Sequence, residues 1–178
     1  MILMKEKRSF WEKRAPAWIA LVLTVPLSIF LGVNRTVAGY AKKAEKAFFE
    51  RSETYGSVSE DLGKYVEQAS RLAALGGRDG EELSRAVEQL REERKSPFSR
   101  GAGVELVYVT AAQLYHELAL SEETRKSAML CFAELDAVRM RLRNHRDYQK
   151  AARRYNRALE AFPASLLCPG GEPVMTFD

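Results

Sequence analysis

Cysteine is scarce in this chain of 178 residues, which contains two, Cys131 and Cys168. Two cysteines exclude a disulfide framework and a cysteine-based zinc site. If residues 121–162 form one helix, Cys131 lies roughly 45 Å from its end, whereas the stretch from Pro163 to Cys168 spans at most about 17 Å. We therefore expect two free thiols, with Cys131 in the core and Cys168 exposed.

Histidine is equally scarce, with two residues, which excludes a histidine-rich metal site. His116-Glu117 opens a metalloprotease-like HExxH pattern, but Leu120 stands where the second histidine is required. Glycines at 76–77 and 101–103 lack the strand-to-helix context and the lysine of a phosphate-binding loop. The sequence predicts no catalytic residue, no cofactor and no metal, so we expect that the protein is not an enzyme.

A strong excess of charge of one sign is also missing, because the net charge is only +4. Residues 1–14 carry five basic and two acidic side chains, a net of +3 that leaves the remaining chain at +1. A nearly neutral body argues against nucleic-acid binding through bulk electrostatics. We expect no nucleic-acid partner.

One long run without charge, residues 15–34, is bracketed by Arg14 and Arg35. Twenty helical residues span about 30 Å, the thickness of a bilayer's hydrocarbon core, and Trp18 lies near the end where indoles prefer the interface. We expect a basic tail over residues 1–14, a transmembrane helix over 15–34 and a single-pass protein of the cell membrane. The alternative is a cleaved signal peptide, whose apolar region is usually shorter, about 7–15 residues.

The rest of the chain has the apolar spacing of α-helices. The predicted helices cover residues 35–53, 57–76, 79–95, 103–118 and 122–162. Residues 103–118 are rich in β-branched side chains, but a lone strand would have nothing to pair with, so a helix is favoured. The predicted fold class is all-α: the transmembrane helix, then an antiparallel bundle over 35–163 with a long C-terminal helix, then an irregular tail over 164–178.

The most specific stretch lies at the end of the predicted last helix. A Tyr-Asn pair, an aliphatic residue three positions later and then Phe-Pro, with a tyrosine seven residues before the pair, resembles the C-terminal signature of the LemA family. The matching residues are Tyr148, Tyr155, Asn156, Leu159, Phe162 and Pro163. Gln149 replaces the signature's first asparagine, His145 stands where an arginine is expected, and the family's Leu-Ile-Pro-Asn-Leu element is absent.

This resemblance implies a divergent LemA-like membrane protein: a short tail, one transmembrane helix and a helical bundle whose body lies in the cytoplasm. The family has no established biochemical activity, so the resemblance supplies architecture rather than mechanism. The basic residues do not fix the orientation, because five precede the apolar run and five follow it within twenty residues.

The rings at positions 148, 155 and 162 lie seven residues apart, along one face of the predicted helix. Core packing with a helix stop at Pro163 is the simpler interpretation of this face. A ligand groove is the alternative.

Basic residues form a second stripe on the predicted last helix, about 27 Å long at helical rise. Its members are Arg139, Arg143, Arg146, Lys150, Arg153 and Arg157. A solvated face, or a seam against the acidic third helix with Glu81, Glu88 and Glu92, is the favoured interpretation. Contact with anionic lipid headgroups or a partner comes next, through Arg146, Lys150, Arg153 and Arg157. Nucleic acid comes last, because no aromatic residue interleaves.

These patterns together predict a membrane-anchored helical scaffold or interaction protein. Membrane lipid and an envelope or membrane protein are the expected partners. The alternatives are an accessory membrane subunit of an enzyme and a ligand-binding bundle with a hidden site. The sequence does not decide the partner, the process or the oligomeric state.

Overall fold

The computed structural model describes the backbone of residues 3–52, 56–98, 102–118, 122–168 and 170–177, with the side chains of 3–16, 102 and 123 left out. Over these residues the chain is all-α and contains no strand. The helices are α1 (Leu3–Phe49), α2 (Val58–Gly76), α3 (Glu81–Glu93), α4 (Ala102–Leu118), α5 (Glu122–Asn144), α6 (Arg146–Glu160) and α7 (Ala164–Leu167).

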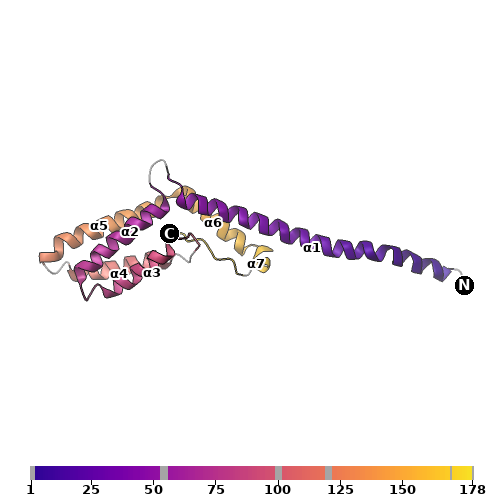
Figure 1. Ribbon diagram of the computed structural model, residues 1–178, viewed down its shortest axis with the longest axis horizontal. Coiled ribbons are helices and arrows are strands. Elements are labelled where there is room, and N and C mark those ends of the chain that lie inside the picture. Colours follow the sequence, from indigo (N-terminus) through magenta and orange to yellow (C-terminus); the bar gives the residue numbers. More distant parts are fainter. Residues whose placement is uncertain (1–2, 53–55, 99–101, 119–121, 169, 178) are drawn as a thin grey trace.

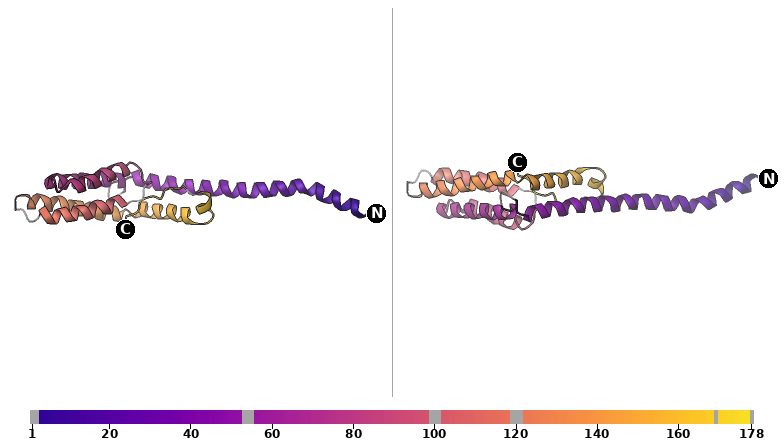
Figure 2. Two further views of the ribbon diagram at one scale, coloured as in Figure 1. Left: turned by 90° about the horizontal axis from the view of Figure 1, so that it is seen from below. Right: turned by 90° about the horizontal axis from the view of Figure 1, so that it is seen from above.

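The helices form an elongated body with α1 projecting from one end (Figure 1). The part of the body farthest from the N-terminus is a bundle in which α2 packs against α5 and α3 against α4. Nearer the N-terminus, α6 and α7 run beside α1, and Figure 2 shows this pairing from two sides. The predicted antiparallel helical bundle is confirmed.

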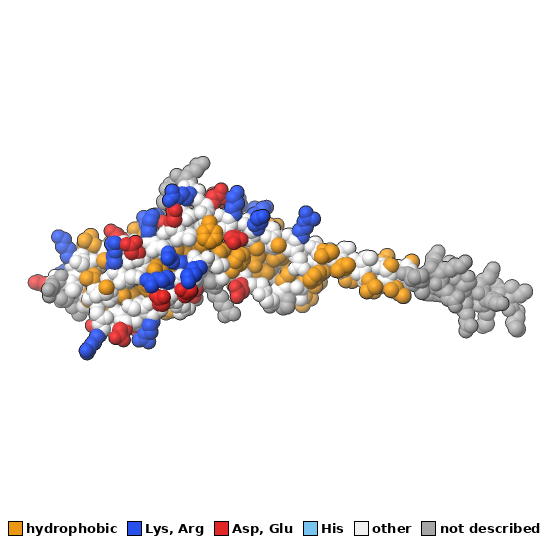
Figure 3. Space-filling model, viewed as in Figure 1, with side chains coloured by type: hydrophobic (Ala, Val, Ile, Leu, Met, Phe, Trp, Pro, Cys, Tyr) orange, Lys and Arg blue, Asp and Glu red, His pale blue; other side chains and the backbone are white. Residues whose placement is uncertain are grey.

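Helix α1 joins the predicted apolar segment and the helix expected after it into one element. The side chains of residues 17–32 are all exposed, whereas Ala44 and Phe48 are fully buried in the core. Among the described helices, α1 is the one long and apolar enough to cross a membrane. Figure 3 shows hydrophobic side chains along the part of α1 that lies outside the body.

Helix α2 begins where the sequence predicts, at a capping box. The Ser57 Oγ accepts a hydrogen bond from the Glu60 amide at 3.1 Å, and a Glu60 carboxylate oxygen accepts one from the Ser57 amide at 3.2 Å. Such a box satisfies amides that a helix start leaves unpaired. Gly77, with φ +55°, ends the helix, and Gly80 lies so close to the Ala73 carbonyl that a Cβ would overlap it.

The predicted helix over residues 103–118 is confirmed as α4, but the one predicted over 122–162 is interrupted. His145 has φ −71° and ψ 72°, outside helical geometry, and separates α5 from α6. Its imidazole is buried against Asp61 of α2, at 2.9 Å from Nε2 to Oδ2. The break therefore coincides with a contact between residues 84 positions apart in the sequence. The local spacing of apolar residues does not reveal such a contact.

Candidate functional site

The family-motif residues of α6 hold the C-terminal segment. Asn156 makes two hydrogen bonds with the backbone of Val174: its amide nitrogen donates to the carbonyl at 2.8 Å, and its amide oxygen accepts from the N–H at 2.8 Å. One heptad earlier, Gln149 does the same with Phe177, at 2.8 and 3.5 Å. Replacement of the signature asparagine by Gln149 therefore keeps a side-chain amide that can both donate and accept.

The motif tyrosines bind the same segment. The Tyr148 hydroxyl donates to the Met175 carbonyl at 2.8 Å, and the Tyr155 hydroxyl donates to the Glu172 carbonyl at 3.2 Å. Both rings are buried, and burial raises the pKa of each phenol. The motif is therefore a clamp on extended backbone, which we call the C-terminal clamp and define as Tyr148, Gln149, Tyr155 and Asn156.

The clamped tail contains no helix over residues 170–177 and belongs to the core, whereas residues 164–167 of the predicted irregular tail form α7. Val174, Met175 and Phe177 are buried, and the Met175 amide donates to the Pro97 carbonyl at 3.0 Å. Sequence reasoning missed this role, although Thr176 between the apolar residues Met175 and Phe177 is a weak signal of extended structure.

The remaining motif residues lie beyond the clamp. Leu159 is half-buried, and Pro163 follows the end of α6 at Glu160. Phe162 is 80% exposed, so its predicted place in the core is wrong. The helix ends two residues before Phe162, and the seven-residue spacing no longer fixes which way its ring faces.

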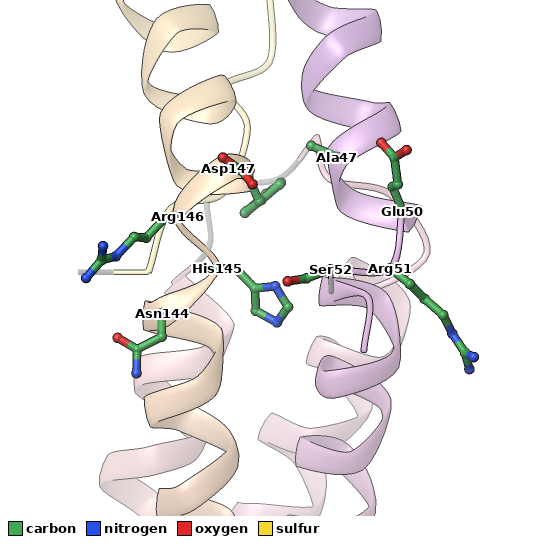
Figure 4. Close-up of a pocket in the computed structure, with 9 residues that line it drawn as sticks. Ala47, Glu50, Arg51, Ser52, Asn144, His145, Arg146 and Asp147 are labelled. Carbon is green, nitrogen blue, oxygen red and sulfur yellow. The ribbon is translucent and has the colours of Figure 1, made fainter. Parts of the chain in front are cut away.

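A hollow of about 570 Å³ lies at the junction between the end of α1 and the break from α5 to α6 (Figure 4). Its lining residues are Ala47, Glu50, Arg51, Ser52, Asn144, His145, Arg146, Asp147 and Tyr148. Figure 4 shows the imidazole of His145 between the two chain segments, with the side-chain oxygen of Ser52 directed toward it. Arg51 and Arg146 point away from the hollow.

Behind the hollow, Asp61 is the most deeply buried acid of this region, with 1% of its side chain exposed. Its second carboxylate oxygen lies 3.6 Å from Arg141 Nε and 3.7 Å from Lys64 Nζ. A carboxylate held this way orients the imidazole and offsets the cost of its own burial. Among the described residues, no group of three histidine, cysteine or acidic side chains is placed to hold a metal ion.

The first two residues of the predicted basic stripe, Arg139 and Arg143, pair with an acidic residue of α4 and not of α3. Arg139 binds Glu105 of α4 with hydrogen bonds of 2.9 and 3.0 Å, and Arg143 lies 3.6 Å from the same carboxylate. The Arg139 guanidinium also lies 3.7 Å from the ring centre of Tyr108. The predicted seam with Glu81, Glu88 and Glu92 is therefore wrong, because α5 packs against α2 and α4.

The members of the basic stripe that lie on α6 line a surface depression of about 400 Å³. Its walls are Gln149 and six basic residues, Arg143, Arg146, Lys150, Arg153, Arg154 and Arg157. Sequence reasoning missed Arg154, which lies one residue beside the predicted spacing. None of Arg146, Lys150, Arg154 and Arg157 forms an ion pair with a described residue. Such a surface suits an anionic group.

Both cysteines are free and half-buried. The Cys168 thiol lies 3.3 Å from the Asn34 amide oxygen, so it is less exposed than predicted. Burial raises the pKa of the Cys131 thiol, which keeps it in the unreactive protonated form.

Comparisons of the chain with protein-family models, with curated proteins and with solved structures found no match.

Proposed function

We propose that the protein is a membrane-anchored helical scaffold of the LemA-like type, with residues 15–34 as the anchor and the body as an interaction module. The observation that carries the proposal is the continuity of α1. Its exposed apolar part runs without interruption into residues such as Ala44 and Phe48, which are fully buried in the core.

An exposed apolar helix of this length is costly in water and favourable in a bilayer. A cleaved signal peptide is less compatible with this arrangement, because α7 and Cys168 pack against the very part of α1 where the apolar run ends. The family resemblance supports the same anchor and implies a body in the cytoplasm.

The helical body has surfaces that could bind a partner, and we propose no catalytic residue in it. The two depressions beside α6 are lined mostly by polar and charged side chains, and the polar groups of the motif bind the chain's own tail. We therefore propose an envelope or membrane protein as the partner.

The anchor is tested by extracting washed membranes with alkaline carbonate. We expect the full-length chain to stay in the pellet and a variant lacking residues 1–34 to be recovered in solution. Recovery of the uncleaved full-length chain in the supernatant would contradict the anchor. A shortened mature chain in the supernatant would indicate a signal peptide instead.

A ligand-binding bundle is the second candidate, favoured by the buried Asp61–His145 pair beside the junction hollow. Ser52 is exposed and lines the hollow, so Ser52→Trp would fill the space, and the melting temperature of each protein without ligand is its own reference. A polar metabolite that raises the melting temperature of the wild type but not of Ser52→Trp would support this candidate. Equal shifts in both proteins would place the ligand elsewhere.

A further inference from the structure

The turn between α6 and α7 exposes two large apolar side chains that the fold does not use. Phe162 is 80% exposed and Leu166 is 70% exposed, the two highest values among the large hydrophobic side chains described. Both exceed the exposure of every such residue in the apolar run of α1. We call Phe162, Pro163 and Leu166 the apolar corner.

The apolar corner lies beside the end of the proposed membrane anchor. A groove of about 430 Å³ separates the two and is lined by α1 residues between Ile29 and Val37 and by residues 158 and 161–164. The Cys168 thiol contacts Asn34, the last residue of the charge-free run. Ile29 lies five residues deeper, which is about 7.5 Å along the helix. The corner is therefore level with the outer part of the apolar run.

We propose that the apolar corner inserts into the bilayer and is a second membrane contact, with phospholipid as its partner. The inference rests on the proposed function, because the level of the bilayer is set by the anchor. Aromatic and aliphatic side chains on an interfacial turn bury their apolar surface at the boundary between headgroups and acyl chains. Within a bilayer, acyl chains fill the groove between Phe162 and α1.

The basic residues of α6 nearest the apolar corner predict that the lipid is anionic. Along the axis of α6, Arg157 lies about 4.5 Å and Arg154 about 9 Å from Glu160, the last residue of the helix, and both line the basic depression. Glu160 is the acid nearest the corner, and Asp147 is the other acid of α6, against five basic residues of this helix. The attraction of basic side chains to anionic headgroups fades beyond a Debye length of about 8 Å. Arg157 lies within this length of the end of α6 and Arg154 at about this length, so they are the two basic residues of α6 closest to anionic phospholipid.

The experiment places a nitroxide label at single cysteines in the full-length chain, with Cys131→Ser and Cys168→Ser as background, in phosphatidylcholine vesicles containing phosphatidylglycerol. Phe162→Cys and Leu166→Cys report on the corner. Val25→Cys lies inside the apolar run, and Leu130→Cys is a matched exposed residue of α5 far from the anchor. Depth is read from collisions with oxygen, which is enriched in lipid, and with a nickel chelate, which stays in water.

We expect labels at 162 and 166 to behave like the label at 25, with several-fold more oxygen collision and less nickel collision than at 130. Labels at 162 and 166 that match 130, while 25 is in lipid, would overturn the corner and leave the anchor intact. A label at 25 that also matches 130 would overturn the anchor, and the corner with it.

A charge comparison tests the headgroup contact. In vesicles without phosphatidylglycerol, the label at 162 should lie shallower. Arg154→Glu with Arg157→Glu should abolish the difference between the two lipid compositions, whereas Arg78→Glu with Arg85→Glu, exposed residues before and within α3, should preserve it. Equal depth of the wild type in both vesicle types would overturn the assignment of anionic lipid.

Discussion

Loss of the Asn156 amide should open the C-terminal clamp without unfolding the bundle. Asn156→Leu removes both hydrogen bonds to Val174, whose side chain is buried. A buried backbone group left without a partner costs about 1–3 kcal/mol, so the two groups together cost roughly 2–4 kcal/mol after partial exposure to water. Since each 1.4 kcal/mol is a factor of ten, protection of the tail should fall roughly 30- to 700-fold.

The assay is amide hydrogen exchange of the full-length chain in detergent, read at Met175. Its amide donates to the Pro97 carbonyl and therefore reports on docking of the tail. Exchange in α2 should change little. Gln89→Leu is the control, because the hydrogen bond of its amide is to Glu93 on the same helix, away from the tail. An unchanged Met175 rate in Asn156→Leu would show that apolar burial alone holds the tail. Equal acceleration in α2 would show that tail and bundle unfold together.

Two further outcomes can be measured by thermal unfolding in detergent. Tyr155→Ala should lower the free energy of unfolding by about 3–5 kcal/mol, as loss of a large buried aromatic does. Phe162→Ala should change it by less than about 0.5 kcal/mol, because the Phe162 ring is exposed. Equal losses in the two variants would show that Phe162 is a core residue. Burial raises the pKa of Tyr65 in the folded state. The unfolded chain therefore releases this proton first, and the stability that is complete below about pH 10 should fall by about 1.4 kcal/mol per pH unit above it. Tyr65→Phe should reduce the alkaline slope by that amount and leave the contributions of Tyr148 and Tyr155, and an unchanged slope would refute the assignment.

The sequence predicts those parts of the fold that depend on local rules. The capping residue Ser57 locates the start of α2, and apolar spacing identifies the buried faces of α2 and α3. The charge-free run likewise identifies the exposed part of α1. These features depend on neighbours within one or two turns, so a single sequence contains enough information.

Features that depend on distant partners are not predictable in this way. The break at His145 accompanies a contact with Asp61, and the seam of Arg139 is made with Glu105, 34 residues away. The clamp is harder still, because Asn156 binds backbone atoms of Val174 that any residue would supply. The sequence therefore identifies the motif residues, but their hydrogen bonds to the tail can be seen only in the folded structure.

In the proposed membrane-anchored arrangement, the alignment of α1 with α2 would set how far from the bilayer a partner binds. From Arg35 to the end of α1 is about 22 Å of helix, and the 19 residues of α2 continue away from the N-terminus for about 28 Å (Figure 1). The turns at the far end of the bundle therefore stand up to about 50 Å from the end of the apolar run. A partner bound there would be held at a fixed distance from the end of the apolar run. Adding seven residues to each of the helices that run along the bundle would increase that distance by about 10 Å.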